Sequence, residues 1–188
     1  LRKGLVATDS KTDTERLRRR ELIYTGVGRT SVSSIVKSVP VSGSDCPIAS
    51  EYFADIRDVH VALGWRDEEH QNYETADNRP LTLDNSKARI ARIICSDKTL
   101  ASDANIQIIA DSVAQYHLSL IKSALLLVAG RIAPVQKITL CGSGEFLTKK
   151  IFDADAFKTT ILSETIGKPA SISACAWALT QLTGKYAS

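Results

Sequence analysis

The clearest pattern of apolar and polar positions lies in the second half of the chain, over residues 102–130. Apolar side chains recur there at steps of three and four residues, which predicts one long helix. Ser102 and Asp103 provide a cap and a favourable negative charge at its start, and Gly130 ends it. Beyond Leu118 the apolar positions extend around nearly the whole circumference, so we expect the second half of the helix to be buried.

A series of strands and helices follows this helix. Residues 137–141 form a nearly continuous apolar run, typical of a central strand covered on both faces. A turn with two glycines then leads into a helix over residues 145–152. A second strand at 159–162 precedes an apolar helix at 171–182. This alternation predicts an α/β layer with at least one parallel pair of strands.

The first half of the chain gives shorter signals. The predicted elements are strands at 4–8, 21–24 and 39–41, a short helix that begins at Thr12, and helices at 50–64 and 86–95. Thr12 and Glu15 have the spacing of a capping box. Pro40 limits its strand to the edge of a sheet. The polar segment 65–84 predicts a long loop of the kind that often contacts ligands.

The composition narrows the class of protein. The chain has 188 residues, 24% charged and 44% hydrophobic, with a net charge of +3 and only 6% aromatic residues. This balance argues against a nucleic-acid partner, and the basic run at 16–20 is better explained as a solvated face. The longest apolar run, at 124–129, is far below the roughly 20 residues that cross a bilayer, so we expect no membrane partner and a cytoplasmic protein.

The cysteines form no pair with zinc-ligand spacing, and we expect no metal site. Cys95, Cys141 and Cys175 stand among apolar residues, which predicts buried free thiols. The chain begins at Leu1 and contains no Met, which leads us to expect a fragment of a longer protein.

The strongest candidate for chemistry is the turn between the strand at 137–141 and the next helix. Its predicted cofactor-binding residues are Gly142, Ser143, Gly144, Glu145 and Phe146. Glycines let a ligand approach the backbone, and a helix amino terminus offers free N–H groups. A tight structural turn without a ligand explains the same pattern equally well.

Two further segments carry candidate substrate-binding residues: Tyr24, Thr25, Arg29 and Thr30 in the first, and Asp77 and Arg79 in the second. Arg29 has the geometry to hold an anionic substrate with two parallel hydrogen bonds. Exposed polar turns are the competing interpretation of both segments.

Two weaker constellations have simpler explanations. Glu51, Asp55 and Asp58 have carboxylates suited to Mg²⁺, although a solvated helix face is the better interpretation. The histidines show no metal-ligand spacing, and His117 is expected in the core.

Several stretches, in order along the chain, resemble one family. They are T-D-T-E-R-L at 12–17, E-L-I-Y-T-G-V-G-R-T at 21–30, F-A-D-I-R-D-V-H-V-A-L-G at 53–64, T-A-D-N-R-P at 75–80, A-R-I-A-R-I-I-C-S-D at 88–97 and C-G-S-G-E-F-L at 141–147. They resemble the tetrahydromethanopterin-linked one-carbon-transfer proteins. These proteins are relatives of the hydantoinase/oxoprolinase group and include the archaeal methanofuran-core synthase.

The resemblance implies a fold and a reaction class. The fold would be a ribonuclease H-like lobe of the actin-like ATPase superfamily, a mixed sheet with flanking helices, over 1–188, with a substrate-side insertion around 31–97. The reaction would be transfer or condensation on a phosphate-activated small molecule in methanofuran or tetrahydromethanopterin biosynthesis. ATP, ADP or a phosphorylated substrate, with Mg²⁺, would bind at the glycine turn, between this lobe and an amino-terminal lobe of the same protein.

The chain departs from the family in one serious respect: the D-I-G-G-type and T-T-T-D-type phosphate segments are absent from this sequence. Asn78 also stands where the family leads us to expect Gly. Two alternatives therefore stay open: a small-molecule or sugar kinase of the same superfamily, and a non-catalytic binding or scaffold domain. Assembly as a homo-oligomer stays open as well.

Overall fold

The computed structural model describes residues 7–151 and 157–186, and the chain divides into two units. The terminal unit combines Leu1–Leu22 with Lys122–Ser188, and the middle unit is Ile23–Ile121. Residues 31–97, for which a substrate-side insertion is expected, all belong to the middle unit. Helices and small sheets occur together, so the class is mixed α/β, as predicted.

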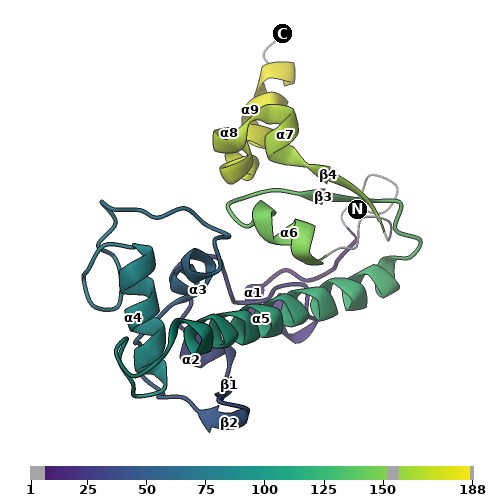
Figure 1. Ribbon diagram of the computed structural model, residues 1–188. Helices are drawn as coiled ribbons and strands as arrows, with labels where there is room; N and C mark the ends of the chain where they lie inside the picture. The colour runs from purple at the N-terminus through teal and green to yellow at the C-terminus, as the bar shows by residue number, and fades with distance from the viewer. Residues whose placement is uncertain (1–6, 152–156, 187–188) are drawn as a thin grey trace. The chain divides into compact units, whose positions relative to one another are not determined.

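The middle unit is built mainly from helices (Figure 1). Its elements are α2 (Val32–Ile35), β1 (Ser38–Val41), β2 (Ser44–Pro47), α3 (Ile56–Ala62), α4 (Leu83–Ile93) and the first part of α5 (Asp103–Ile132). Fully buried side chains from these elements, among them Val32, Val39, Ile56, Ile90 and Ile109, form one hydrophobic core. The apolar face of the first half of α5 is therefore covered, as its helical pattern predicts.

The antiparallel pair β1–β2 has a two-residue turn. Ser42 and Gly43 both have positive φ, at 49° and 80°, as in the turns that suit the twist of a hairpin. The strand predicted at 39–41 is confirmed. Its partner β2 was missed because the residues Ser-Asp-Cys-Pro carry no apolar alternation, and the turn alone gave a signal.

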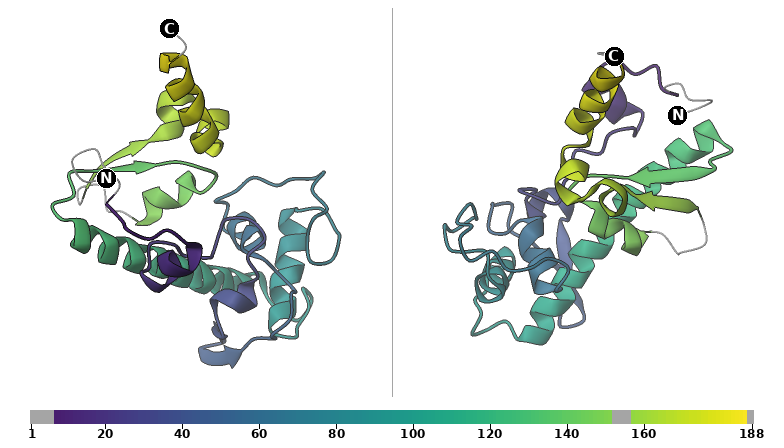
Figure 2. Two further views of the ribbon diagram at one scale, coloured as in Figure 1. Left: turned by 180° about the vertical axis from the view of Figure 1, so that it is seen from behind. Right: turned by 90° about the horizontal axis from the view of Figure 1, so that it is seen from above.

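The terminal unit contains a parallel strand pair (Figure 2). Its elements are α1 (Asp13–Arg18), the last part of α5, β3 (Lys137–Leu140), α6 (Glu145–Ile151), β4 (Lys158–Ile161), α7 (Leu162–Ile166), α8 (Lys168–Ile172) and α9 (Ala174–Tyr186). β3 and β4 run parallel, from Lys137 opposite Lys158 to Leu140 opposite Ile161, which confirms the predicted parallel pair.

The covered central strand predicted at 137–141 is wrong for the described part of the chain. There β3 pairs only with β4, and Lys137 and Thr139 are exposed. An apolar run indicates that a strand favours burial, but the strand is buried only where other helices or strands pack against its faces.

Several boundaries also differ from those predicted. The capping box of Thr12 and Glu15 is present at α1. The strand predicted at 21–24 is wrong, because this segment is irregular. In the strand predicted at 4–8, residues 4–6 lie outside the described residues, and residues 7 and 8 are not in a strand. The helix predicted at 50–64 starts only at Ile56, because the Asp55 side chain caps it there.

The second half of α5 is not buried as predicted. Leu126 is 49% exposed and Leu127 is 44% exposed, and Ala124 is the buried residue of this stretch. Ile121, Leu125, Val128 and Ala129 are partly buried among the described residues, so only part of the apolar circumference stays open. By length and composition α5 also passes as a membrane-spanning helix, but core helices of soluble proteins pass the same test, so one such helix is weak evidence.

The burial predicted for three cysteines is wrong. Cys95, Cys141 and Cys175 are exposed free thiols. Cys95 follows the end of α4 with a positive φ, and Cys141 stands between β3 and the glycine turn. Apolar neighbours indicate a strand or helix, but they do not show which side of the element a residue occupies.

Candidate functional site

The glycine turn, residues 142–146, joins β3 to α6 in the terminal unit. Gly142 has a φ of +96°, in the region that side chains with a Cβ rarely adopt. Its N–H donates to the Ser171 hydroxyl at 3.1 Å, and its carbonyl accepts from the N–H of Glu145 at 3.3 Å. The conformation itself therefore requires glycine at position 142.

Glu145 fastens this turn to the segment that follows β4. Its Oε1 accepts from the backbone N–H of Ser163 at 3.2 Å and from the Ser171 hydroxyl. Burial raises the pKa of Glu145, but the hydrogen bonds from Ser163 and Ser171 outweigh it and hold the pKa below its usual value. The carboxylate is thus ionised at neutral pH and fixes the turn against α8.

A hollow of about 260 Å³ lies against the glycine turn. Its walls are Gly142, Ser143, Glu145, Phe146, Ile161, Ser163, Glu164, Lys168 and Ile172. Phe146, Ile161 and Ile172 supply apolar surface, Lys168 supplies a cation, and Glu145 and Glu164 supply carboxylates. This mixture suits a ligand that combines an apolar or aromatic part with polar groups.

The predicted turn residues lie at this hollow, except that Gly144 belongs to the turn and not to the walls. Sequence reasoning missed the residues from β4, α7 and α8. A signal was available, because the alternation of strands and helices predicted at least one parallel pair of strands. The carboxyl ends of parallel strands meet at one edge of the sheet, where α/β proteins bind ligands.

Two of the predicted substrate residues anchor residues 24–30 within the middle unit. Thr25 Oγ1 lies 2.9 Å from Nε2 of His117, which is buried in α5. The Thr30 hydroxyl accepts from the N–H of Gly26 at 2.9 Å, and the Thr30 carbonyl accepts from the N–H of Ile56 at 2.9 Å. Thr25 and Thr30 hold the backbone of this segment.

The other two predicted residues of this segment face solvent. Tyr24 is 83% exposed, and Arg29 is exposed without a hydrogen bond or ion pair to any residue that the structure describes. Both side chains are accessible to a ligand.

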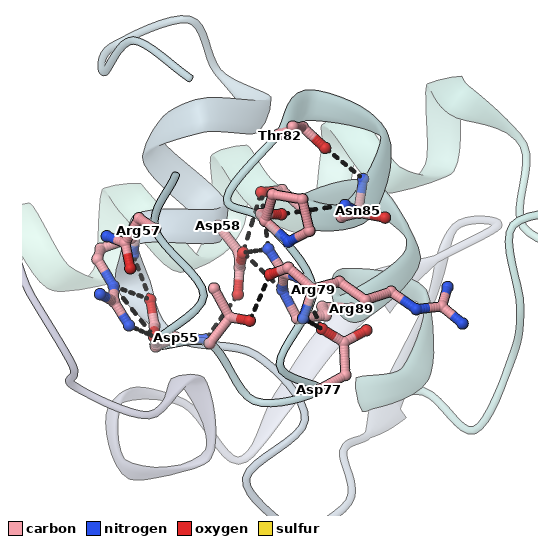
Figure 3. Close-up of polar contacts among 12 residues, drawn as sticks. Asp55, Arg57, Asp58, Asp77, Arg79, Thr82, Asn85 and Arg89 are labelled. Atoms are coloured by element: carbon pink, nitrogen blue, oxygen red, sulfur yellow. Dashed lines mark hydrogen bonds and ion pairs between the residues drawn. The ribbon is translucent and has the colours of Figure 1, made fainter. Parts of the chain in front are cut away.

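Asp77 lies in an ion network anchored by α4 (Figure 3). Its Oδ1 accepts from Arg89 Nη1 at 2.8 Å, and its Oδ2 accepts from Arg92 Nη1 at 2.9 Å. Burial raises the pKa of Asp77, but the bonds from Arg89, the Arg79 backbone and Arg92 outweigh it, so the pKa lies below its usual value. Arg79 itself is exposed, and its side chain points away from Asp77 and Arg89.

The same network continues into α3. Arg89 is fully buried and donates through Nε to Asp58 Oδ1 at 2.9 Å. Asp55 accepts from Arg57 Nη2 at 2.7 Å, and burial together with Asp55 raises the pKa of Tyr52 to about 12. The solvated face predicted for Asp55 and Asp58 is therefore wrong, because buried arginines compensate both carboxylates.

Asp55 and Asp58 are also the carboxylates that the sequence offers to Mg²⁺. Within residues 7–151 and 157–186, no group of three or more His, Cys, Asp or Glu side chains is placed to hold a metal ion. The carboxylates of Asp55 and Asp58 are committed to arginine partners. The described residues therefore do not fit a protein-bound Mg²⁺ site.

Two histidines pack in the core of the middle unit. The rings of His60 and His117 are stacked with centroids 6.5 Å apart, and His60 also stacks on Trp65 at 5.9 Å. Burial lowers the pKa of His60 to about 3 and also lowers the pKa of His117, so both rings are neutral at physiological pH. The prediction of His117 as a core histidine is confirmed.

Comparison with known proteins gives two related enzymes, while no family model matches the chain. One is a (4-{4-[2-(gamma-L-glutamylamino)ethyl]phenoxymethyl}furan-2-yl)methanamine synthase of Methanocaldococcus jannaschii, 27% identical over 175 residues, which are 93% of this chain and 52% of the relative. The other, with the same name, is from Methanococcus vannielii and is 29% identical over 171 residues, 88% of this chain and 76% of the relative.

The chain thus spans about half the length of the first relative. The similarity covers most of this chain. Both relatives are synthases, so it relates the chain to biosynthetic enzymes. The chain is similar to furan-methanamine synthases, which supports the resemblance to the methanofuran-core synthases that its motifs indicated.

Proposed function

We propose that this chain is part of a cofactor-biosynthesis enzyme of the methanofuran pathway that joins a furan-methanamine to a phenol. The observation that carries the proposal is the similarity to two synthases over most of the chain. The hollow at the predicted glycine turn supports it, because it offers a ligand site of suitable chemistry.

The name of the relatives' product defines the bond at issue, an ether between a phenol oxygen and a methylene group on the furan. We propose a phosphate-activated methylene as the electrophile. The phenol oxygen forms the new C–O bond, the C–O bond to the phosphate breaks, and the phosphate leaves with the electron pair. The phenol proton passes to a base, to which we assign no residue. We also propose that tetrahydromethanopterin-linked relatives share this reaction class.

We place the nucleotide or the phosphorylated substrate in the hollow beside Gly142, in a lobe of the ribonuclease H-like, actin-like type. The succession β3, α6 and β4 supports that fold, since it is a parallel pair with a helix between the strands. Phe146 and Ile172 offer an apolar surface for a ring, and Lys168 offers a positive charge. The remaining wall of the site is proposed to come from a second lobe of the same protein. The described residues do not fit a protein-bound Mg²⁺ site, so we assign none of them as a metal ligand.

The activity test uses the enzyme expressed from its whole reading frame. It is incubated with a γ-L-glutamyl-substituted phenol and a phosphate-activated (aminomethyl)furan, and the ether product is measured by mass spectrometry. Appearance of the product supports the proposal. Transfer of the γ-phosphoryl group of ATP to an acceptor, without ether formation, would instead identify a kinase.

The ligand site is tested with Gly144→Val. The positive φ falls on Gly142, so a side chain at position 144 tests ligand approach with less backbone strain. We expect Gly144→Val to weaken binding of ADP or inorganic diphosphate in calorimetric titrations while the thermal midpoint changes little. The matched variant Gly142→Ala should lower the midpoint. Unchanged affinity in a folded Gly144→Val protein would remove the turn from the site.

A further inference from the structure

The backbone of Arg79 is held by side chains of its own loop. Its N–H donates to Asp77 Oδ1 at 3.2 Å, and its carbonyl accepts from the Thr75 hydroxyl at 2.7 Å. The carbonyl of the next residue, Pro80, accepts from Asn85 Nδ2 on α4 at 3.0 Å. These hydrogen bonds therefore fix the backbone position from which the Arg79 side chain extends into solvent.

The chain turns sharply just before this position. Asn78 has a φ of 55°, a left-handed conformation that asparagine tolerates better than most residues. Asp77 is fixed in turn by Arg89 and Arg92, which α4 supplies. A rigid helix thus determines where residues 75–80 lie.

The ion pairs formed by Asp55, Asp58 and Asp77 do not include Arg79. Asp55 pairs with Arg57, Asp58 pairs with Arg89, and Asp77 pairs with Arg89 and Arg92. These ions form a balanced set of three carboxylates and three guanidinium groups.

Arg79 lies outside this set. It is exposed, and its guanidinium has no hydrogen bond or ion pair to any residue in the described part of the chain. A buried network of this kind contributes little net stability compared with apolar packing, whereas it does fix a geometry.

We propose that Arg79 binds an anionic group of the substrate, and that Asp77 and Arg89 are positioning residues that hold residues 75–80 for this purpose. Asp77 then acts through Arg79 and does not touch the substrate, because both of its oxygens are already bonded. The guanidinium is suited to a carboxylate or a phosphate, which it holds through two parallel N–H donors.

The inference rests on the proposed function for the identity of the substrate. Under that function two sources supply the anion: the α-carboxylate of the γ-L-glutamyl group and the phosphate of the activated furan. The shared chemistry is a planar or tetrahedral oxyanion. Arg29, the other exposed arginine candidate, lacks such side-chain bonds to its own backbone among the described residues.

The test is a double-mutant cycle on ligand affinity with the full-length enzyme. The probes are γ-L-glutamylethylamide, which carries the carboxylate, and inorganic diphosphate, each titrated by calorimetry. Arg79→Met should weaken one of them by at least about tenfold, the loss expected for a hydrogen bond between charged groups. Arg79→Lys should recover part of the affinity, because the charge remains but the fork is lost.

The positioning role of Asp77 is tested by combining Asp77→Ala with Arg79→Met. Asp77→Ala should weaken the same probe by about threefold or more in the wild-type background and should have no further effect in Arg79→Met. Asp77→Asn, which keeps an acceptor for the Arg79 N–H, should be milder. A residue that only stabilises the fold would lower the thermal midpoint without this dependence on Arg79.

Two controls keep the result decisive. Arg18→Met removes one exposed charge from α1 and should leave affinity for both probes unchanged. If Asp77→Ala does not fold, Arg92→Met replaces it, since Arg92 is 37% exposed and supplies only one bond to Asp77.

The possible results separate this inference from the proposed function. Equal affinity of Arg79→Met and wild type, or no saturable binding of either probe to wild type, overturns the inference. Binding that depends on Arg79 without ether formation leaves the inference standing and rejects the proposed reaction.

Discussion

Replacing Arg89 by methionine should destabilise the middle unit strongly. Arg89 is fully buried and donates to Asp58 at 2.9 Å and to Asp77 at 2.8 Å. Methionine fills much of the same space but leaves both carboxylates without their main cation. Removing one partner of a buried ion pair costs about 3–5 kcal/mol, because the remaining charge is buried and uncompensated. We expect a loss of free energy of unfolding in that range at pH 7.5.

The cost should shrink in acid. Burial raises the pKa of Asp58 even in the wild type, and Arg89 opposes this effect, so the variant should raise the pKa further. A carboxylate with a raised folded-state pKa contributes stability below its unfolded pKa of about 3.9 and loses it as pH rises through the folded value. Asp77, with a lowered pKa, instead loses its contribution in the wild type as pH falls. The Asp58 effect reduces the difference between variant and wild type from pH 7.5 towards pH 4.5, whereas the Asp77 contribution is lost only below the unfolded pKa of about 3.9.

Urea denaturation measures this difference. Trp65 stacks on His60 and reports the middle unit, so the second tryptophan is removed with Trp177→Phe in both proteins. Arg18→Met, on the exposed face of α1, is the charge control and should leave the transition unchanged. A loss below about 1 kcal/mol at pH 7.5, or a loss that is independent of pH, would refute the role assigned to the network.

Two further predictions concern α5 and the thiols. Ile109→Ala should lower the free energy of unfolding by about 2–5 kcal/mol in denaturant melts, because Ile109 is fully buried. Leu126→Ala should lower it much less, because Leu126 is 49% exposed. Equal losses would show that the second half of α5 is covered in solution. Cys95 and Cys141 should react quickly with a thiol reagent in the native protein, and Cys46, which is half-buried, should react more slowly; uniform slow reaction would contradict the exposures.

Local signals in the sequence were sufficient for elements whose determinants lie within a few residues. The capping box of Thr12 and Glu15 sets the start of α1, and the cap at Ser102 receives the N–H of Asn105 at 3.2 Å. The glycine turn was also found, since the φ of Gly142 is a local requirement. Each of these features depends on backbone geometry that neighbouring residues determine.

The chemistry of the candidate sites depended on contacts between distant residues. Asp58 and Arg89 are 31 positions apart in the sequence, and nothing in either segment indicates that they form a buried pair. Lys168 reaches the hollow only because β3 and β4 pair in parallel. Asp77 and Arg79 were identified as candidates from the turn sequence. That sequence did not indicate that Asp77 is bonded to Arg89 and Arg92 while the Arg79 side chain is exposed.

The sequence by itself determined the order of the main helices, the strand–turn–helix at residues 137–151, and the resemblance to the methanofuran-core synthases. These features follow from local periodicity, capping and backbone conformation. Only the tertiary structure decided which apolar faces are covered, as α5 demonstrates, and which charges are compensated. Burial and ion pairing are properties of surfaces brought together by the fold, and a pattern along the chain records only the preference for them.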